Sequence, residues 1–187
     1  MPKLLIGLTG PARSGKDTVA GFLEGFGFYR VAFADPIRAG LAAMLDVPRW
    51  QLFTGGMKER PISPHWPAHI TPRTLMQTLG TEWGRDTIDP DFWLRIAADK
   101  WFACGKSMVI SDVRFESEAA WVRSQGGQVW HITRPNRPEI GGVEGHRSEA
   151  GVAVVDGDVL LENTGSVDAL GYSVRLRVQE LKQAGLL

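Results

Sequence analysis

The sequence predicts an α/β fold, a three-layer sandwich in which helices cover both faces of a mostly parallel β-sheet. Short apolar stretches of strand length alternate along the chain with longer stretches that carry helical periodicity. Because parallel strands need crossover connections, this alternation favours a parallel sheet covered on both faces. A second observation is the glycine-rich loop at residues 10–18, which joins the first apolar stretch to the first helical one. Strand, glycine loop and helix in this order are typical of a phosphate-binding loop, or P-loop.

The expected elements follow one another with little interruption. Strands are expected at residues 3–8, 29–33, 107–111, 128–132 and 158–161. Helices are expected at residues 16–26, 36–45, 71–85, 90–102, 116–124 and 166–184. The helix at 71–85 opens at Thr71 or Pro72 and carries Leu75, Met76 and Leu79 at helical spacing. Repeated prolines before it predict an irregular segment at 55–71.

Length and composition bound the functional classes. The chain has 187 residues, and we expect residues 1–187 to form one domain with a good core. Its 21 basic and 21 acidic residues cancel, so nothing indicates a nucleic acid polymer or a membrane as partner. The single cysteine, Cys104, excludes an intramolecular disulfide and fits a reducing compartment. With no long apolar run and no signal-peptide pattern, we expect a cytoplasmic protein.

The P-loop runs from Gly10 to Thr18 with the sequence GPARSGKDT. Gly10 and Gly15 let the backbone curl around an anion with its N–H groups pointing inward. The following helix adds the positive end of its dipole, and Lys16 can reach the outer phosphates of a nucleotide. The alternative interpretation is a glycine-rich turn capped by a helix.

The residue after the lysine departs from the usual pattern. This position is normally Ser or Thr, whose hydroxyl binds Mg²⁺, but here it is Asp17 and the hydroxyl follows at Thr18. Our hypothesis is that Asp17 binds Mg²⁺ directly or through water, which explains a negative charge beside a triphosphate. Without a metal, Asp17 would only be a favourable acid in the first helical turn.

A second carboxylate ends a later apolar strand. Asp112 follows Met108-Val109-Ile110-Ser111, and the carboxyl edge of a parallel sheet would place it beside the P-loop. There it can hold Mg²⁺ or the water shell of the ion. The alternative is an N-cap of the next helix. Arg114, two residues on, can reach an anionic substrate.

Arginines gather in two further places. Arg134, Arg137 and Arg147 lie in a segment with three glycines, which predicts a lid over transferring phosphates or, alternatively, a solvated surface loop. Asp35 and Arg38 begin the second helix, near where an acceptor would bind, although Asp35 alone reads as a helix cap.

Histidines and tryptophans give weaker signals. His65 and His69 are four residues apart, but Pro64 and Pro67 argue against a shared helical face and a metal site. Trp66, Trp83 and Trp93 can each stack on a base, with core packing as the alternative.

Several blocks, in the same order along most of the chain, together resemble one family. They are residues 14–18, 73–82, Trp93, 111–114 with Glu118, 131–135, 146–149 and 163–166. With these blocks the chain resembles the deoxynucleoside monophosphate kinases best known from bacteriophages. The P-loop by itself would also match relatives of dephospho-coenzyme A kinase and phosphomevalonate kinase.

The resemblance implies a nucleoside-monophosphate-kinase-like P-loop fold with a lid at about residues 134–149. It also implies a substrate-binding helical insert at about residues 35–103. The implied reaction transfers the γ-phosphate of ATP to a deoxynucleoside monophosphate, with ATP and Mg²⁺ as cofactors. The partner would be this small-molecule substrate, and a homodimer stays open. The segment before Arg73 is shorter than in the longest members, which leaves the base preference open.

The resemblance also implies roles for individual residues. The catalytic residues would be Lys16, Asp17, Asp112 and Arg114, with Asp17 and Asp112 as ligands of Mg²⁺. ATP would be bound by Gly10, Arg13, Ser14, Gly15, Lys16, Thr18, Arg134 and Arg137. The acceptor would be bound by Arg38, Arg73, Gln77, Gly80, Thr81, Trp93, Arg114, Glu118 and Arg147.

Two other functions stay open from the residues. The acceptor can instead be dephospho-coenzyme A or a phosphorylated isoprenoid precursor, although the block at 73–82 favours a nucleotide. The chain can also be a nucleotide-binding switch that senses or hydrolyses ATP while it binds a protein partner.

Overall fold

The computed structural model describes residues 3–135 and 151–187. Contacts divide the chain into two compact units. The sheet unit comprises Met1–Ala32 and Lys100–Leu187, and the helical unit comprises Phe33–Asp99. No helix among the described residues is long and apolar enough to cross a membrane.

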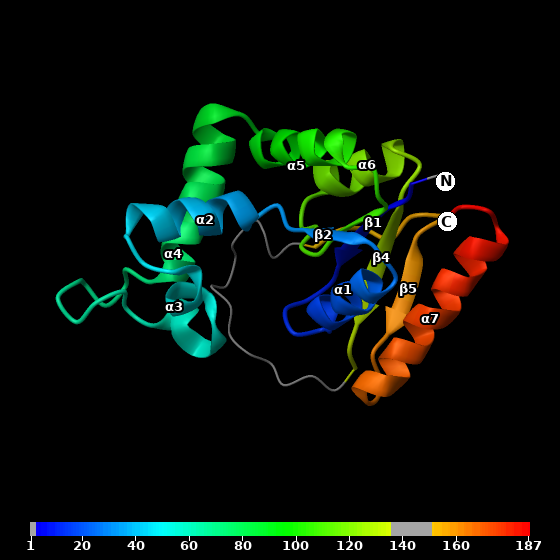
Figure 1. Ribbon diagram of the computed structural model, residues 1–187. Coiled ribbons are helices and arrows are strands. Elements are labelled where there is room, and N and C mark those ends of the chain that lie inside the picture. Colours follow the sequence, from blue (N-terminus) through cyan, green and yellow to red (C-terminus); the bar gives the residue numbers. More distant parts are fainter. Residues whose placement is uncertain (1–2, 136–150) are drawn as a thin grey trace. The chain divides into compact units, whose positions relative to one another are not determined.

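The sheet unit is built on five strands that all run parallel (Figure 1). They are β1 (Leu5–Thr9), β2 (Tyr29–Val31), β3 (Met108–Ile110), β4 (Gln128–Thr133) and β5 (Val159–Glu162). Their order is β2-β3-β1-β4-β5, so β1 lies at the centre. The predicted parallel sheet is confirmed, and each strand lies within two residues of its expected bounds. The P-loop therefore leaves the middle of the sheet.

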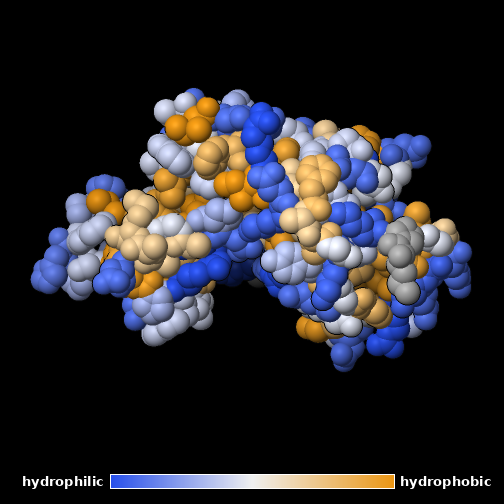
Figure 2. Space-filling view, turned by 45° about the horizontal axis from the view of Figure 1, so that its top comes forward, coloured by the Kyte–Doolittle hydropathy of each residue, from blue (hydrophilic) through white to orange (hydrophobic). Residues whose placement is uncertain are grey.

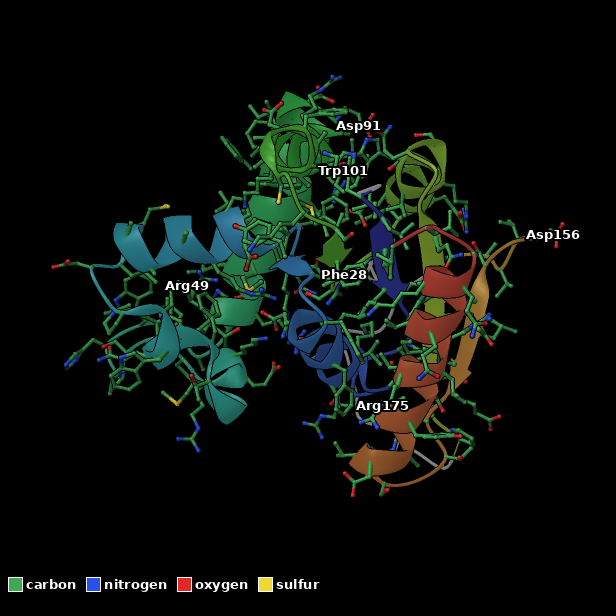
Figure 3. The ribbon with its side chains drawn as sticks, turned by 45° about the vertical axis from the view of Figure 1, so that its right-hand side comes forward. Phe28, Arg49, Asp91, Trp101, Asp156 and Arg175 are labelled. Atoms are coloured by element: carbon green, nitrogen blue, oxygen red, sulfur yellow. The ribbon has the colours of Figure 1, made fainter. Side chains whose placement is uncertain are left out.

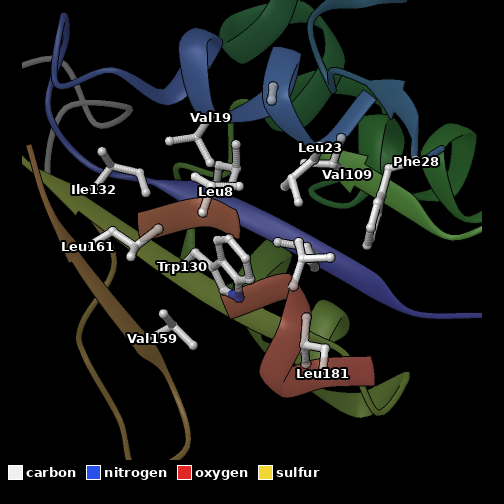
Figure 4. Close-up of a cluster of buried hydrophobic side chains, with 14 of the residues drawn as sticks. Leu8, Val19, Leu23, Phe28, Val109, Trp130, Ile132, Val159, Leu161 and Leu181 are labelled. Atoms are coloured by element: carbon white, nitrogen blue, oxygen red, sulfur yellow. The ribbon is translucent and has the colours of Figure 1, made fainter. Parts of the chain in front are cut away.

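One face of the sheet packs against α1 (Lys16–Gly25) and α7 (Val167–Gln183). Side chains alternate between the two faces of the sheet along β1, and Ile6 and Leu8 point to this face. There they form a hydrophobic core with buried residues of α1 and α7. Trp130 of β4 is fully buried at its centre (Figure 4). Replacing such a buried tryptophan by alanine costs about 3–5 kcal/mol of stability. The helix that follows the P-loop is thus fixed on the sheet by a well-packed core.

The other face packs against α6 (Glu116–Ser124). A Cβ at Gly7 of β1 would lie 2.9 Å from a methyl carbon of Val113 and 3.1 Å from one of Val122. Glycine at this position therefore lets α6 lie close against the central strand. With helices on both faces, the predicted three-layer sandwich is confirmed.

The helical unit contains mostly short helices. They are α2 (Asp35–Met44), α3 (Arg49–Phe53), the 3₁₀-helix η1 (Gly55–Glu59), α4 (Pro72–Gln77) and the π-helix η2 (Thr78–Ile88). The helix α5 (Phe92–Ala103) begins here and ends in the sheet unit. Neither α3 nor η1 was expected from the sequence. The helix η1 lies within the segment predicted to be irregular (55–71), and α3 lies just before that segment.

The expected helix at 71–85 is present but changes type within its length. Thr71 caps it, since its side chain accepts from the Thr74 N–H and the Thr74 hydroxyl accepts from the Thr71 N–H. From Thr78 the helix widens to a π-helix. The indole N–H of Trp93 donates to the carbonyl oxygen of Gly80 at 2.7 Å. One carbonyl of the π-helix therefore has a hydrogen-bond partner outside that helix. π-Helices are rare and occur often at functional sites.

The surface mixes polar and apolar residues. In Figure 2 hydrophobic residues form separate patches among hydrophilic ones. In the sheet unit, the Lys3 ammonium donates to the carbonyl oxygen of Trp101 at 2.7 Å and lies 3.9 Å from the centre of its ring (Trp101 is labelled in Figure 3). This pair fixes the last turns of α5 to the start of the described chain.

Candidate phosphate-transfer site

The P-loop follows β1 and has positive φ angles at Gly10 (132°), Arg13 (61°) and Gly15 (112°). A Cβ at Gly10 would lie 2.2 Å from the carbonyl oxygen of Ile132. Only glycine fits there, because both the backbone angle and the space exclude a side chain. Gly15 is the N-cap of α1 and has no side chain to cap the first turn. The loop therefore presents a helix N-terminus and a turned backbone, which together favour an anion.

The ammonium of Lys16 folds back over this loop. It donates to the carbonyl oxygens of Gly10 and Pro11, each at 2.6 Å. Ser14 is fully buried, and its hydroxyl has no hydrogen-bond partner within the described residues. The P-loop thus carries both the positive charge of Lys16 and the Ser14 hydroxyl, which is unpaired within the described residues.

Asp17 contacts Arg30, for which the sequence predicts no role. Its carboxylate pairs with the Arg30 guanidinium of β2, which also lies 3.6 Å from Glu24. The Asp17 side chain is 89% exposed, so the pair lies at the surface of the sheet unit. Whether Asp17 binds a metal stays a prediction.

An open pocket of about 260 Å³ adjoins the loop. Among the residues predicted to bind ATP and its metal, the pocket brings together Arg13, Gly15, Lys16, Asp17, Thr18 and Arg134. Asn163 and Gly165, from the segment after β5, complete the wall with Val167 and Leu170 of α7. Residues predicted from two distant segments therefore share one pocket. Arg137 and Arg147 lie outside the described residues.

Asp112 lies at the carboxyl end of the central strands. The Ser111 N–H donates to Val31 of β2 and the Val113 N–H donates to Leu8 of β1, each at 3.0 Å. These bonds hold Asp112 at the edge where the P-loop leaves the sheet. The N-cap of α6 is Phe115, so the capping role that was the alternative for Asp112 is not observed.

Glu118 holds the turn that carries Arg114. Its carboxylate is almost completely buried, and one oxygen accepts from the backbone N–H groups of Arg114 (2.7 Å) and Phe115 (3.1 Å). A direct contact between Glu118 and the acceptor stays a prediction, while its support of Arg114 is visible.

A buried charged cluster lies between β4, β5 and α6. The Asp158 carboxylate accepts from Arg123 at 3.0 and 2.7 Å and lies 2.9 Å from Nε2 of His131. Burial by itself raises the pKa of Asp158. Hydrogen bonds from Arg123, the Val155 N–H and His131 outweigh that effect, so the pKa lies below its usual value.

Two of the predicted acceptor arginines, Arg38 and Arg73, lie in the helical unit, each beside a carboxylate. Arg38 and Arg49 both donate to one oxygen of Asp35, at 3.3 and 3.2 Å (Arg49 is labelled in Figure 3). Nε of Arg73 donates to Glu59 at 2.6 Å, and this bond is the main cause that lowers the pKa of Glu59.

Four further predicted acceptor residues lie on or beside the π-helix: Gly80 and Thr81 belong to it, Gln77 ends α4 directly before it, and Trp93 of α5 packs on it. Gly80 packs so closely on Ile37 that a Cβ would lie 3.0 Å away, and Thr81 beside it is buried. Trp93 is 5% exposed and packs on Gly84, where a Cβ would lie 2.6 Å from its indole nitrogen. The structure thus gives Trp93 a packing role, which was the alternative interpretation. Gln77 is half-buried one turn earlier.

Two comparisons decide the family. The model of the family described as deoxynucleotide monophosphate kinase matches residues 64–174. The putative deoxynucleotide monophosphate kinase of Acanthamoeba polyphaga mimivirus is 31% identical over 183 residues, 88% of this chain and 91% of that protein. The chain belongs to the deoxynucleotide monophosphate kinase family. The resemblance stated from the sequence blocks is thereby confirmed.

Other relatives of the family cover less of the chain. The deoxynucleotide monophosphate kinase of Enterobacteria phage T4 is 31% identical over 107 residues, 55% of this chain and 43% of that enzyme. The enzyme of Escherichia phage RB69 is 29% identical over 102 residues, 52% of this chain and 41% of that enzyme. The match therefore spans less than half of each phage enzyme.

Solved structures agree with the fold of this family member. TT1252 from Thermus thermophilus superposes with a TM-score of 0.52 at 17% identity, over 97% of this chain and 99% of that chain. Dephospho-CoA kinase from Campylobacter jejuni superposes with a TM-score of 0.52 at 14% identity, over 97% and 98%. At this identity the likeness supports the fold alone.

Several residues of this family member escaped the sequence analysis. The main ones are Arg30, Arg49, Arg85, Arg123 and Asp158, while Asn163 stood only within the block at 163–166 and had no predicted role. Arg85 is buried in the π-helix and donates to the carbonyl oxygen of Pro90 at 3.1 Å. A charged residue within an apolar stretch, such as Arg30 in β2, was an available signal. The other partners lie far apart in sequence.

His65 and His69 are exposed, and the described residues contain no group of three or more residues able to hold a metal.

Proposed function

We propose that this chain transfers the γ-phosphate of ATP, in line, to the phosphate of a deoxynucleoside monophosphate, giving the diphosphate and ADP. The observation that carries the proposal is the pocket beside the P-loop, where Lys16 and the α1 N-terminus lie with Arg13 and Arg134. Membership of the family supplies the acceptor class. We also propose that the reaction takes place in the cytoplasm.

The donor phosphates fit the P-loop. An ionised triphosphate needs several N–H donors and a nearby positive charge, which the turn at Gly10–Gly15 and Lys16 offer. The buried hydroxyl of Ser14, unpaired within the described residues, is a further donor at this turn. Lys16 is held at the loop by two carbonyl oxygens, which keeps its positive charge where the donor phosphates would bind.

We propose Mg²⁺ as the second cofactor, with Asp17 and Asp112 as the residues that would hold it. The described part of the chain contains no group of three or more metal-ligating residues. This fits Mg²⁺, which is commonly held by one or two carboxylates together with phosphate oxygens and water. When bound, the ion offsets negative charge on the phosphates. Asp17 is exposed beside the loop, and Asp112 is half-buried at the sheet edge.

The acceptor side needs positive charge more than a base. A phosphate monoester is largely ionised at neutral pH, because its second pKa is about 6. The barrier is therefore repulsion between two anions and their alignment. Arg38 and Arg73 supply guanidinium charge on the helical unit, beside Asp35 and Glu59. We propose that they bind the acceptor phosphate, and that Arg114 acts on the group in transfer.

A coupled assay of ADP release tests the proposal. Mg-ATP is supplied with a panel of deoxynucleoside monophosphates, ribonucleoside monophosphates and dephospho-coenzyme A. We expect ADP release that depends on a deoxynucleoside monophosphate, and the panel then reports the base preference. ADP release without any acceptor would indicate a nucleotide-binding switch, and release with dephospho-coenzyme A alone would indicate another kinase.

A further inference from the structure

Asn163 connects three segments of the sheet unit at the P-loop. Its side-chain Nδ2 donates to the carbonyl oxygen of Ser14 at 2.9 Å, across 149 positions of sequence. Its own backbone N–H donates to the carbonyl oxygen of Thr133, at the end of β4, at 2.7 Å. The residue is 8% exposed. Its amide group is therefore held in place while it bonds the loop.

This bond fixes the orientation of one peptide group. A trans peptide is planar, so its C=O and N–H point in opposite directions. Because the Ser14 carbonyl is directed at Asn163, the N–H of Gly15 points away from it. The Gly15 N–H makes no hydrogen bond within the part of the chain that the structure describes. The orientation of this Gly15 N–H donor is therefore set by Asn163, which lies on the opposite side of the peptide.

Close packing keeps the two residues together. A Cβ at Gly15 would lie 2.7 Å from Nδ2 of Asn163 and 3.2 Å from a methyl carbon of Leu170. The loop backbone is thus in contact with the Asn163 amide. A shorter side chain at this position would not reach the carbonyl, and a carboxylate would repel it.

We propose that Asn163 is a positioning residue for phosphate binding: it locks the Ser14–Gly15 peptide so that the Gly15 N–H faces the donor phosphates. The inference rests on the proposed function only in taking a nucleotide polyphosphate as the ligand of the P-loop. It assigns Asn163 no contact with the reacting atoms. The peptide of Ser14 and Gly15 would turn more freely without the tether, and the loop would lose part of its preorganisation.

The test measures the binding of ADP and of inorganic tripolyphosphate by calorimetry, which needs no acceptor and no turnover. The variants are Asn163→Ala and Asn163→Asp, and the matched control is Leu161→Ala, which removes a buried side chain two positions earlier. Loss of one hydrogen bond predicts affinities for both ligands that are about five- to tenfold lower in Asn163→Ala. Asn163→Asp should lose more, because its charge repels the Ser14 carbonyl and the phosphates alike. The control should keep wild-type affinity despite a lower melting temperature.

The outcomes are distinct. Unchanged affinity for both ligands in Asn163→Ala would overturn the proposal. A loss for ADP with unchanged tripolyphosphate binding would also overturn it, because Asn163 would then contact the nucleoside. In turnover, the KM for ATP should rise while the KM for the acceptor stays constant. If wild type binds both ligands but phosphorylates no deoxynucleotide, the proposed function fails and the role of Asn163 is still measured. If wild type binds neither, both proposals fail.

Discussion

The guanidinium of Arg30 contacts the carboxylate of Asp17, the residue directly after the P-loop lysine. Two roles for Asp17 follow from this pair. Asp17 binds Mg²⁺ when the nucleotide arrives, or it serves only as the partner of Arg30. The two roles differ in what they predict for the metal.

We expect Asp17→Asn to raise the Mg²⁺ concentration needed for half-maximal activity, because a neutral amide binds the ion more weakly than a carboxylate. Arg30→Gln is the matched control, since it breaks the same pair and leaves the carboxylate intact. The measurement is initial rate against free Mg²⁺ at fixed ATP. If both variants show the wild-type dependence on Mg²⁺, Asp17 is not a metal ligand.

Lys16→Met should remove most of the activity without unfolding the chain. The Lys16 ammonium lies at the loop, against the carbonyl oxygens of Gly10 and Pro11. Without it, the negative charge that develops on the transferring phosphate is left unbalanced. We expect kcat to fall by about a hundredfold or more. Lys182→Met, at an exposed position of α7, should behave as wild type. A Lys16→Met enzyme with near-normal kcat would show that phosphoryl transfer does not use this lysine.

Arg73→Ala should raise the KM for the deoxynucleoside monophosphate by about tenfold, since a charge-assisted hydrogen bond is worth about 1.5–3 kcal/mol. Steady-state kinetics with the acceptor varied provide the measurement. Arg95→Ala is the control, because Arg95 is paired with Asp89 in the same unit and has no proposed role. A fall in kcat with constant KM would instead assign Arg73 to the transition state.

The Asp158 cluster predicts a dependence of stability on pH. The folded pKa of Asp158 lies below the unfolded value of about 3.9. Its contribution is therefore complete above that unfolded value and is lost as pH falls through the folded pKa. Asp158→Asn should cost about 2 kcal/mol at pH 7, because the partly buried Arg123 loses its charge-assisted hydrogen bonds to the carboxylate and keeps Glu116 at 3.9 Å.

Urea unfolding at pH 7 and at pH 3 measures this contribution. The difference in stability between wild type and Asp158→Asn should shrink at the lower pH. Asp156→Asn, in the exposed turn nearby, should leave both values unchanged. An equal difference at both pH values would contradict the assigned cause.

Gly84→Ala should destabilise the helical unit. A Cβ there would lie 2.6 Å from the indole nitrogen of Trp93, and overpacking of this kind costs about 1–3 kcal/mol. Gly40→Ala is the matched control within α2, where, apart from the neighbouring backbone of the helix itself, no atom of the described residues lies within 4 Å of the added carbon. Alanine should stabilise that position slightly, since it favours helix more than glycine does. In thermal denaturation, the melting temperature should therefore fall in Gly84→Ala and rise slightly in Gly40→Ala, relative to wild type.

The sheet unit was predictable because its signals are local. The stretch at 116–124 became a helix with the expected bounds, and the apolar stretches around Met108 and Gln128 became strands. The P-loop was readable for the same reason, since its glycines, lysine and helix are contiguous. The likeness of separate blocks to one family then supplied the acceptor class.

The helical unit and the supports of the site were harder to predict. The π-helix depends on Trp93, which lies 13 positions after the carbonyl that it bonds. Arg30 and Asp17 are also 13 residues apart, and Arg123 and Asp158 are 35 apart. No pattern within one segment announces such partners, because only the folded chain brings them together. Sequence therefore identified the residues at the P-loop better than the residues that hold them.

The bond between Asn163 and Ser14 also has a consequence for biosynthesis. The phosphate loop is translated 149 positions before its tether, so the two emerge from the ribosome at different times. Since β5 must also dock on β4 before Asn163 reaches the loop, a nascent chain carries the nucleotide-binding motif long before it carries the locked form. Added nucleotide should consequently protect stalled nascent chains from proteolysis only when they extend past β5.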